Sequence, residues 1–195
     1  MITDRDREII DHIYQFEFAT INQIAKIFCR DQKFGYDIAR RRLKKIITQG
    51  DYMKSIRNSE TNELIFVPID SKIKKISKHD VLLMNYYTEL IGLGVEIEVF
   101  EKEKQFKNMF VDAFCVLKFG GYRLYQLVEI QLRHDFVDMT RFKDAVPSIV
   151  SNTSNYYPKI VIVQDTKHDY SNENETEMEV VMLKTDLKDI AKVLL

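Results

Sequence analysis

The stretch VDAFCVLKFGGYRLYQLVEIQL, residues 111–132, decides how the second half of the chain is expected to fold. Two apolar runs flank Gly120-Gly121, which is the pattern of a β-hairpin closed by a two-residue turn. Counting back from the turn along both arms sets Asp112 directly opposite Glu129, and Gln131 follows on the same face. The sequence therefore predicts two carboxylates and an amide at the open end of a hairpin.

Two carboxylates this close repel each other unless a cation lies between them. Mg²⁺ favours one or two carboxylates together with waters and phosphate oxygens, so Asp112 and Glu129 are the candidate metal ligands. Together with Gln131 they form the candidate catalytic set. The alternative is a pair of solvent-facing acids at the end of an edge hairpin, and a single β-bulge would change the register.

Composition and charge describe an ordinary globular chain with two unlike halves. The 195 residues are 45% hydrophobic and 30% charged, and no apolar run approaches the roughly 20 residues that span a bilayer. The charged N-terminus lacks a signal peptide core, so a cytoplasmic protein without membrane contact is expected. Residues 1–78 hold 16 basic and 11 acidic side chains, a net +5, and residues 79–195 hold 13 and 19, a net −6. Cys29 and Cys115, far apart in apolar surroundings, are expected to be reduced core residues.

The basic half shows the order helix, helix, basic helix and hairpin. Apolar residues at helical spacing predict helices over 3–18, 19–28 and 36–50. Two short strand-like runs predict strands over 52–57 and 63–68. This order resembles a winged helix-turn-helix, in which the third helix enters the major groove and the hairpin is the wing.

The third helix is the candidate DNA-reading element. A helix in the major groove needs Arg and Lys near phosphates and a few side chains at base edges. The alternative for its charge run ARRRLKK is a solvated helix face. The candidate DNA-binding residues belong to this helix, to the residues just before it and to the hairpin: Lys33, Tyr36, Arg40, Arg41, Arg42, Lys44, Lys45, Lys54 and Arg57.

The acidic half is expected to form an α/β module. Its predicted elements are a helix, a strand, the hairpin, a helix, two strands and a terminal helix, over residues 79–92, 95–101, 110–118, 122–132, 136–150, 159–164, 179–184 and 185–194. Further charged candidates are an additional acid, three phosphate contacts and two ligands: Glu89, then Arg133, Arg141 and Lys143, then His79 and His134. A surface or structural role is the alternative for each.

The whole pattern resembles a known family. A helix, three strands with Asp and Glu-x-Gln on the hairpin, a helix and a strand resemble the PD-(D/E)xK nuclease fold. A winged helix followed by this module is similar to the replication-relaxation family of plasmids, phages and conjugative elements, with HDVLLMNYYTEL, FVDAF and LVEIQL as the matching segments. The fold class implied is α+β, with an N-terminal winged helix-turn-helix over 1–78 and a PD-(D/E)xK nuclease-like α/β module over 79–195.

The resemblance implies a double-stranded DNA-binding protein, sequence-specific or structure-specific, that assists replication initiation or DNA relaxation and mobilisation. DNA binding requires no cofactor, and the expected partners are duplex DNA, a second copy of the chain and a replication or relaxase protein. A homodimer is expected if the target is an inverted repeat, since each copy would read one half-site.

Two other functions stay open. One is a Mg²⁺-dependent DNA endonuclease that uses Asp112, Glu129 and Gln131, with Mg²⁺ as its cofactor. In the nuclease family a lysine stands at the position of Gln131, and an amide can neither act as a base nor carry charge. The other is a winged-helix transcriptional regulator whose second module senses a ligand or a partner.

Overall fold

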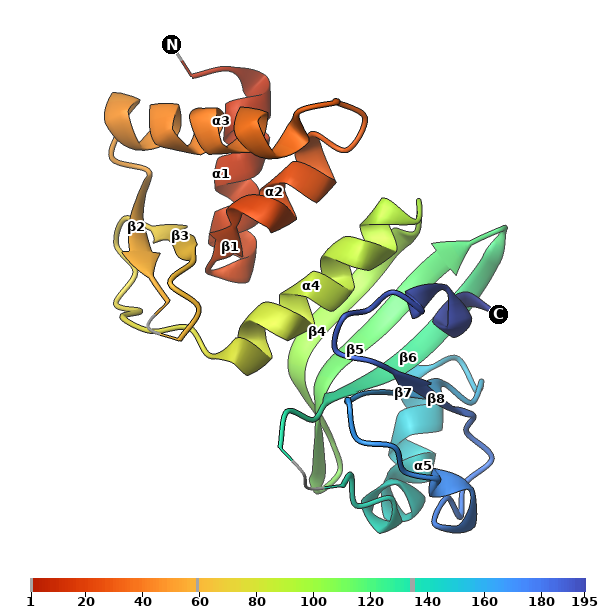
Figure 1. Cartoon of the computed structure of the whole chain (residues 1–195). Coiled ribbons are helices and arrows are strands. Elements are labelled where there is room, and N and C mark those ends of the chain that lie inside the picture. Colours follow the sequence, from red (N-terminus) through yellow and green to blue (C-terminus); the bar gives the residue numbers. More distant parts are fainter. Residues whose placement is uncertain (1, 59, 134–135) are drawn as a thin grey trace. The chain divides into compact units, whose positions relative to one another are not determined.

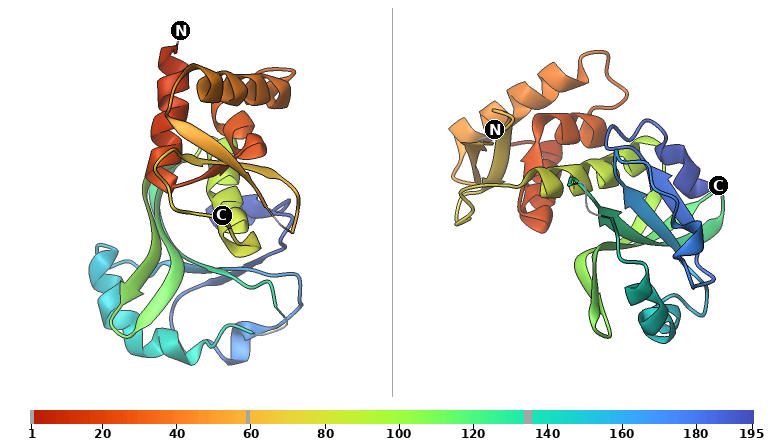
Figure 2. Two further views of the ribbon diagram at one scale, coloured as in Figure 1. Left: turned by 90° about the vertical axis from the view of Figure 1, so that its left-hand side faces the viewer. Right: turned by 60° about the horizontal axis from the view of Figure 1, so that its bottom comes forward.

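The computed structural model describes residues 2–58, 60–133 and 136–195. The chain falls into two compact units, Met1–Thr88 and Glu89–Leu195 (Figures 1 and 2). The division lies inside helix α4 (Lys78–Gly92), whereas the sequence places the boundary at the start of this helix. Each unit combines helices with a sheet, which confirms the α+β class.

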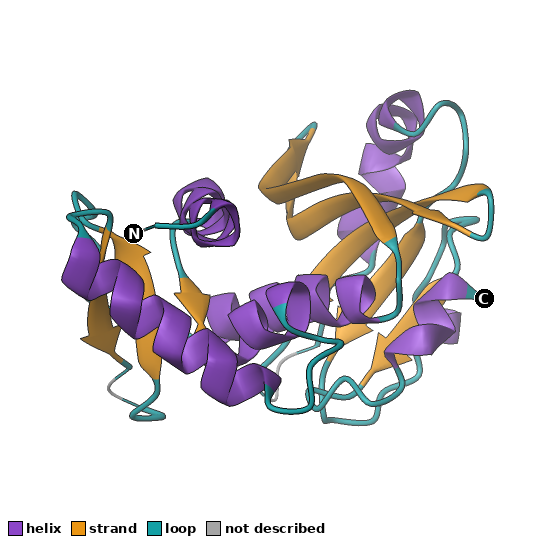
Figure 3. Ribbon diagram, turned by 90° about the horizontal axis from the view of Figure 1, so that it is seen from above, coloured by secondary structure: helices purple, strands orange, loops and turns teal. Residues whose placement is uncertain are grey.

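The first unit packs helices against a small antiparallel sheet. Its elements in chain order are α1 (Asp4–Phe16), β1 (Ala19–Thr20), α2 (Ile21–Phe28), α3 (Gly35–Gln49), β2 (Met53–Arg57) and β3 (Leu64–Pro68). The strands lie in the order β1-β3-β2, and α3 runs beside the β2-β3 hairpin (Figure 3). The predicted helices and hairpin are confirmed. Strand β1 was not predicted, because two residues are too few to show an alternating pattern.

Two capping boxes set the starts of α1 and α2. The Thr3 hydroxyl accepts a hydrogen bond from the Asp6 N–H, and the Asp6 carboxylate accepts one from the Thr3 N–H. Thr20 and Gln23 repeat the arrangement. These bonds satisfy N–H groups that the first turn of a helix leaves without partners.

The first half of α4 belongs to the first unit because its side chains pack there. The Gln23 amide of α2 donates to the Asn85 side chain at 2.8 Å and to the Val81 carbonyl at 3.3 Å. The Tyr87 ring lies 4.7 Å from the Phe16 ring of α1, measured between centroids. These contacts explain why the unit extends past the start of α4.

The second unit is built on a five-stranded mixed sheet. The strands are β4 (Glu96–Phe106), β5 (Met109–Phe119), β6 (Tyr122–Ile130), β7 (Lys159–Val163) and β8 (Val180–Leu183), in the spatial order β4-β5-β6-β7-β8. The first three strands pair antiparallel, whereas β6, β7 and β8 are parallel. The carboxyl ends of β6, β7 and β8 therefore meet at one edge of the sheet.

The register of β5 and β6 is the predicted one. Phe119 pairs with Tyr122, and the ladder runs without a shift to Ala113 and Val128. The two turn glycines have φ of 58° and 85°, the left-handed conformation that a two-residue hairpin turn of type I′ needs. The positions that follow Ala113 and Val128 in this register are Asp112 and Glu129, the predicted carboxylate pair.

Helix α5 (Thr140–Asn152) packs against one face of this sheet. Phe142 and Ile149 of α5 are fully buried in a cluster that includes Leu127 of β6 and Ile160 of β7. The helix thus covers the face on which Leu127 lies, and by the two-residue period of β6 Glu129 lies on the same face.

Two predicted helices of the second unit are shorter than expected. Helix α5 begins later because the Asp138 carboxylate accepts hydrogen bonds from the N–H and hydroxyl of Thr140, which holds the preceding chain in a turn. The C-terminal segment forms only the 3₁₀ helix η2 (Ile190–Leu194) in place of a helix over 185–194. Leu187 has a φ of 54°, which an α-helix cannot include.

Cys29 and Cys115 are buried and free, as predicted. Burial raises the pKa of both thiols, so both remain protonated and unreactive near neutral pH. Of the helices within the described ranges, none is long and apolar enough to cross a membrane.

Candidate functional site

Helix α3 presents a basic face to solvent. Leu43 and Ile46 belong to its buried stripe, which fixes the helix against the core of the first unit. Arg40, Arg41 and Lys44, here called the basic trio, are exposed on the same helix. These three cations lie away from the buried stripe and face solvent.

The contacts of the basic trio are weak and local. Arg40 lies 3.7 Å from the Asp37 carboxylate, and Arg41 donates from Nε to the Asp37 carbonyl at 3.3 Å. Lys44 forms no ion pair with any residue that the structure describes. Exposed pairs of this kind contribute little to stability, so the trio is available to an anionic partner.

A pocket of about 580 Å³ opens between α3 and the β2-β3 hairpin. The basic trio lines it on the α3 side, and Ile21, Leu64 and Phe66 contribute apolar surface. Basic side chains therefore stand directly beside the groove that separates helix and hairpin.

Arg42 and Lys45, predicted to bind DNA with the trio, lie against α1. Arg42 Nη1 is 3.3 Å from both carboxylate oxygens of the fully buried Asp6, and Lys45 Nζ is 4.0 Å from one of them. Burial raises the pKa of Asp6, but hydrogen bonds from Thr3 and the charges of Arg42 and Lys45 outweigh it, and the pKa is lowered overall. These two cations therefore neutralise a buried acid.

The four remaining predicted DNA contacts fall into two groups. Lys33 and Tyr36 are exposed around the start of α3, with Lys33 lying 5.6 Å from the centroid of the Phe34 ring. Lys54 donates to two backbone carbonyls just after β3. Arg57 donates to the turn of the β2-β3 hairpin. The first two are free to reach a ligand, whereas the last two brace the hairpin.

At the open end of the β5-β6 hairpin, Asp112 links the two strands. Its Oδ2 accepts a hydrogen bond from the Ile130 N–H at 2.7 Å, one residue beyond Glu129. The paired residues of the ladder end at Ala113 and Val128, so the side chain takes the place of a backbone acceptor. The carboxylate of Asp112 is thereby held at the carboxyl end of β6.

Glu129 forms an ion pair with α5. Its Oε1 lies 2.6 Å from Nη2 of Arg141, and the side chains are 5% and 32% exposed, respectively. Arg141 also donates from Nη1 to the Phe110 carbonyl at 3.3 Å. A carboxylate this buried needs a countercharge. The sequence suggests a metal ion as the countercharge of Glu129, whereas the structure places the guanidinium of Arg141 there.

Gln131 continues the sheet at the carboxyl end of β6. Its N–H donates to the Val163 carbonyl at 2.9 Å, which places it beside Gln164 in the parallel register. The buried Gln164 side chain donates to the Thr166 carbonyl and accepts from the Tyr170 hydroxyl. Both glutamines are neutral and cannot act as bases. Gln164 and Tyr170 were not predicted here, since nothing in their local pattern marks them.

Two other charged candidates have partners of their own. Lys143 forms an exposed ion pair with Glu175. His79 lies 3.9 Å from Asp80 at the start of α4. Hydrogen bonds from His79 and from the Ser77 cap lower the pKa of Asp80 to about 2, against the opposing effect of burial. Each pair is an ordinary structural interaction.

The last candidates add no further ligand set. Arg133 is exposed, Glu89 is half-buried on α4, and His134 lies outside the described residues. Across residues 2–58, 60–133 and 136–195, no group of three or more His, Cys, Asp or Glu side chains is arranged to hold a metal ion. A metal at Asp112 and Glu129 would therefore rest on two carboxylates, waters and its substrate.

Comparison with known proteins gives a distant structural likeness. No family model matches the chain, and no curated protein matches it. Among solved structures, the chain is similar to a repair endonuclease from Pyrococcus abyssi, with a TM-score of 0.38 and 15% identity. The match covers 68% of this chain and 62% of that chain, so it spans less than two thirds of the other protein.

Proposed function

We propose that this protein binds double-stranded DNA through the exposed face of α3. The observation that carries the proposal is the basic trio, which stands on a helix beside a β-hairpin and lines the pocket between them. In a winged helix-turn-helix, the helix in this position enters the major groove and the hairpin contacts the neighbouring backbone. The trio would contact phosphates, and Lys33 and Tyr36 would reach base edges.

The resemblance to the replication-relaxation family favours a role in replication initiation or DNA relaxation and mobilisation over that of a transcriptional regulator. A homodimer on an inverted repeat and a replication or relaxase protein are the partners that this role requires. The second unit would then serve for docking or dimerisation. The buried carboxylate of Glu129 in this unit is already paired with an arginine, which favours this non-enzymatic use.

Duplex binding across a salt titration tests the proposal. Replacing the basic trio with alanine is expected to weaken binding and to reduce the slope of log K against log salt by about 3, at roughly 0.9 per lost phosphate contact. The control replaces the exposed lysines Lys107, Lys118 and Lys188 of the second unit with alanine, for the same change in charge. Equal behaviour of the two triple variants would refute the assignment of DNA binding to α3.

A Mg²⁺-dependent endonuclease is the second candidate, favoured by the hydrogen bond between Asp112 and Ile130. This bond holds one carboxylate against the strand that carries the other. Asp112 and Glu129 would hold the metal, whose chemistry is to polarise a phosphate and activate a water. Gln131 adds neither charge nor a base, so any cleavage is expected to be slow.

Nicking of supercoiled plasmid in Mg²⁺ or Mn²⁺ separates the two functions. The parent protein is expected not to cut. Metal-dependent cutting by the parent that is lost in Asp112→Asn would establish the endonuclease instead. Retardation of the same plasmid reports DNA binding independently of cleavage.

A further inference from the structure

The side chain of Phe34, at the start of α3, extends into solvent. It is 62% exposed, more than any other phenylalanine in the part of the chain that the structure describes. Tyr36, two residues later, is 48% exposed. Single apolar residues scattered on a surface are ordinary, whereas neighbouring exposed rings indicate a contact surface.

Phe34 also occupies a position that favours a different kind of residue. Hydroxyl side chains cap three other helices, those of Thr3 at α1, Thr20 at α2 and Ser77 at α4. The N-cap of α3 is Phe34, whose ring has no acceptor for the first N–H groups of the helix. Helix α5 likewise begins at an apolar residue, but that residue, Met139, is buried in the core. The ring of Phe34 serves neither the helix nor the core, which favours a role in binding.

The loop before α3 holds the ring in this position. The Gln32 N–H donates to the Cys29 carbonyl and the Gly35 N–H donates to the Gln32 carbonyl, each at 3.0 Å. A Cβ at Gly35 would lie only 2.7 Å from the Cys29 carbonyl oxygen, so glycine fits here without a shift of the backbone and a larger residue does not. Because an ordered backbone presents the ring, little conformational freedom is lost when the ring binds.

Both exposed rings lie beside the basic trio. Tyr36 precedes Arg40 by four residues, which places the two side chains on one side of the helix. Phe34 precedes Arg41 by seven residues, a spacing with the same effect. The Lys33 ammonium lies 5.6 Å from the centroid of the Phe34 ring. A surface that combines cations with exposed rings suits a nucleic acid, whose phosphates pair with cations and whose bases stack on rings.

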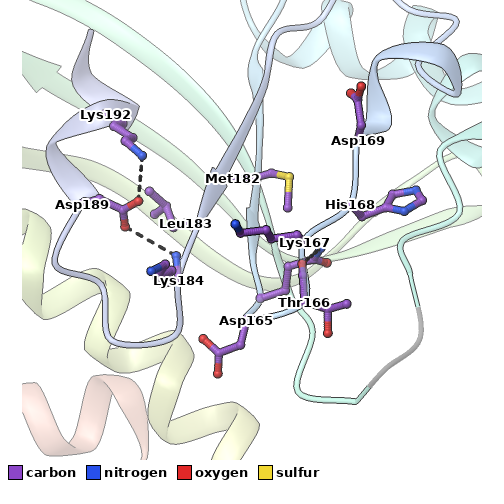
Figure 4. Close-up of a pocket in the computed structure, with 11 residues that line it drawn as sticks. Asp165, Thr166, Lys167, His168, Asp169, Met182, Leu183, Lys184, Asp189 and Lys192 are labelled. Carbon is purple, nitrogen blue, oxygen red and sulfur yellow. Dashed lines mark hydrogen bonds and ion pairs between the residues drawn. The ribbon is translucent and has the colours of Figure 1, made fainter.

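The pocket of the second unit lacks this charge. It has a volume of about 620 Å³ and opens at the carboxyl ends of β7 and β8 (Figure 4). Acids and ammonium groups line it in equal number: Asp165, Asp169, Asp189, Lys167, Lys184 and Lys192. The pocket beside α3 is lined by the basic trio together with apolar and hydroxyl side chains. Of these two pockets, charge favours the one at α3 for a polyanion.

We propose that Phe34 stacks on an unpaired base, so that the preferred target is duplex DNA with adjoining unpaired bases. The inference rests on the proposed DNA binding through α3 and names its target class. In a paired duplex the base faces are covered by their neighbours, and a phenylalanine ring reaches only the methyl group of thymine in the major groove. An unpaired base offers a whole face, and the loss of one such stacking contact weakens binding by about tenfold.

Fluorescence anisotropy of the full chain with two labelled probes tests the proposal. The probes are a paired duplex and the same duplex with a short central run of mismatches. The parent is expected to bind the mismatched duplex about tenfold more tightly than the paired one. Phe34→Ala and Phe34→Leu are expected to lose this preference and to bind the paired duplex as the parent does, because neither side chain has a ring face. Phe34→Tyr keeps the ring and is expected to keep the preference.

Two controls accompany these variants. Tyr122→Ala removes a ring that is 75% exposed at the β5-β6 turn and is expected to bind both probes as the parent does. Thermal unfolding of Phe34→Ala is expected to match that of the parent, since the ring is exposed and makes no cap bond.

The outcomes separate this inference from the proposed function. Equal binding of both probes by the parent, or a preference that survives in Phe34→Ala, overturns the inference. It is also wrong if Phe34→Ala weakens binding of both probes equally and Phe34→Leu restores it, which would indicate contact with thymine methyl groups. A loss of self-association in Phe34→Ala, measured by analytical ultracentrifugation, would assign the ring to a contact between copies and overturn the inference as well. The basic-trio variant is expected to bind both probes more weakly with the preference unchanged, and its binding as tightly as the parent would refute DNA binding through α3 itself.

Discussion

Arg141→Gln is expected to destabilise the second unit more than the substitution of a partly exposed helical residue usually does. The guanidinium is the countercharge of Glu129, whose side chain is 5% exposed. Removing one partner of a buried ion pair leaves an uncompensated charge and costs about 3–5 kcal/mol. Because Arg141 itself is 32% exposed, water relieves part of this cost, and a loss of about 2–3 kcal/mol in the free energy of unfolding is expected.

A double-mutant cycle measured by thermal and urea unfolding isolates the ion pair. Adding Glu129→Gln to Arg141→Gln removes the stranded charge, so the double variant is expected to be about 1–2 kcal/mol more stable than the sum of the single effects. The matched control is Lys143→Gln on the same helix. Its pair with Glu175 is exposed on both sides, at 58% and 54%, and its loss is expected to have little effect on stability.

The same variants test whether the carboxylates can take a metal. Mg²⁺ is expected to leave the stability of the parent unchanged, because Arg141 already neutralises Glu129. In Arg141→Gln the ion can supply the missing charge, and at ten times its dissociation constant it would stabilise the folded state by about 1.4 kcal/mol. Unfolding of both proteins with and without Mg²⁺ measures the difference.

Two results would refute this reasoning. If Arg141→Gln is as stable as Lys143→Gln and shows no coupling to Glu129→Gln, the ion pair does not hold the site together. If Mg²⁺ stabilises the parent as much as Arg141→Gln, the carboxylates are open to metal in the native protein. The second result would favour the endonuclease.

Three further predictions concern pH, the cap of α1 and catalysis. Burial lowers the pKa of His12 from 6.5 to about 4, so the unfolded state binds the proton more readily. Stability that is present above pH 6.5 is lost as the pH falls toward 4, by about 2 kcal/mol between pH 7 and 5. In urea titrations His12→Phe is expected to remove this dependence, and a dependence that survives contradicts it. Asp6→Asn is expected to cost about 1–2 kcal/mol in the same assay, because it weakens the capping box and its ion pairs with α3, and a neutral effect would contradict this. Gln131→Lys is expected to produce no plasmid nicking, and cleavage gained by it and abolished by adding Asp112→Asn would contradict the non-enzymatic function.

The elements that could be predicted from sequence have local signals. Helices α1 and α2 begin at threonine caps before apolar residues at helical spacing, and the β5-β6 hairpin is specified by two glycines between apolar runs. The late start of α5 and the short η2 depend on turns made by Asp138 and Leu187. Neither aspartate nor leucine marks a turn by itself. The helices predicted from the spacing of apolar residues were therefore too long.

The charge run of α3 shows where local pattern is insufficient. Its five cations look equivalent in sequence, yet Arg42 and Lys45 are turned toward a neighbouring helix. The difference comes from Asp6, a buried acid on α1 that the fold brings beside them. Which cations remain for DNA is therefore set by a tertiary contact, and the basic trio could be identified only after α1 and α3 were packed.

The partner of Arg141 is likewise decided by a tertiary contact, and this contact bears on function. Asp138 and Asp144 stand three residues to either side of it, so both acids are nearer to it in sequence than Glu129. Packing of α5 on the sheet selects Glu129 instead. A guanidinium stays protonated at any physiological pH and cannot accept a proton, so Arg141 supplies the charge that Gln131 lacks without supplying a base. Hydrolysis at this site would require a metal bound beside the arginine and a water activated without a base from either residue. DNA binding through α3 requires neither step, and for this reason it is the function we favour.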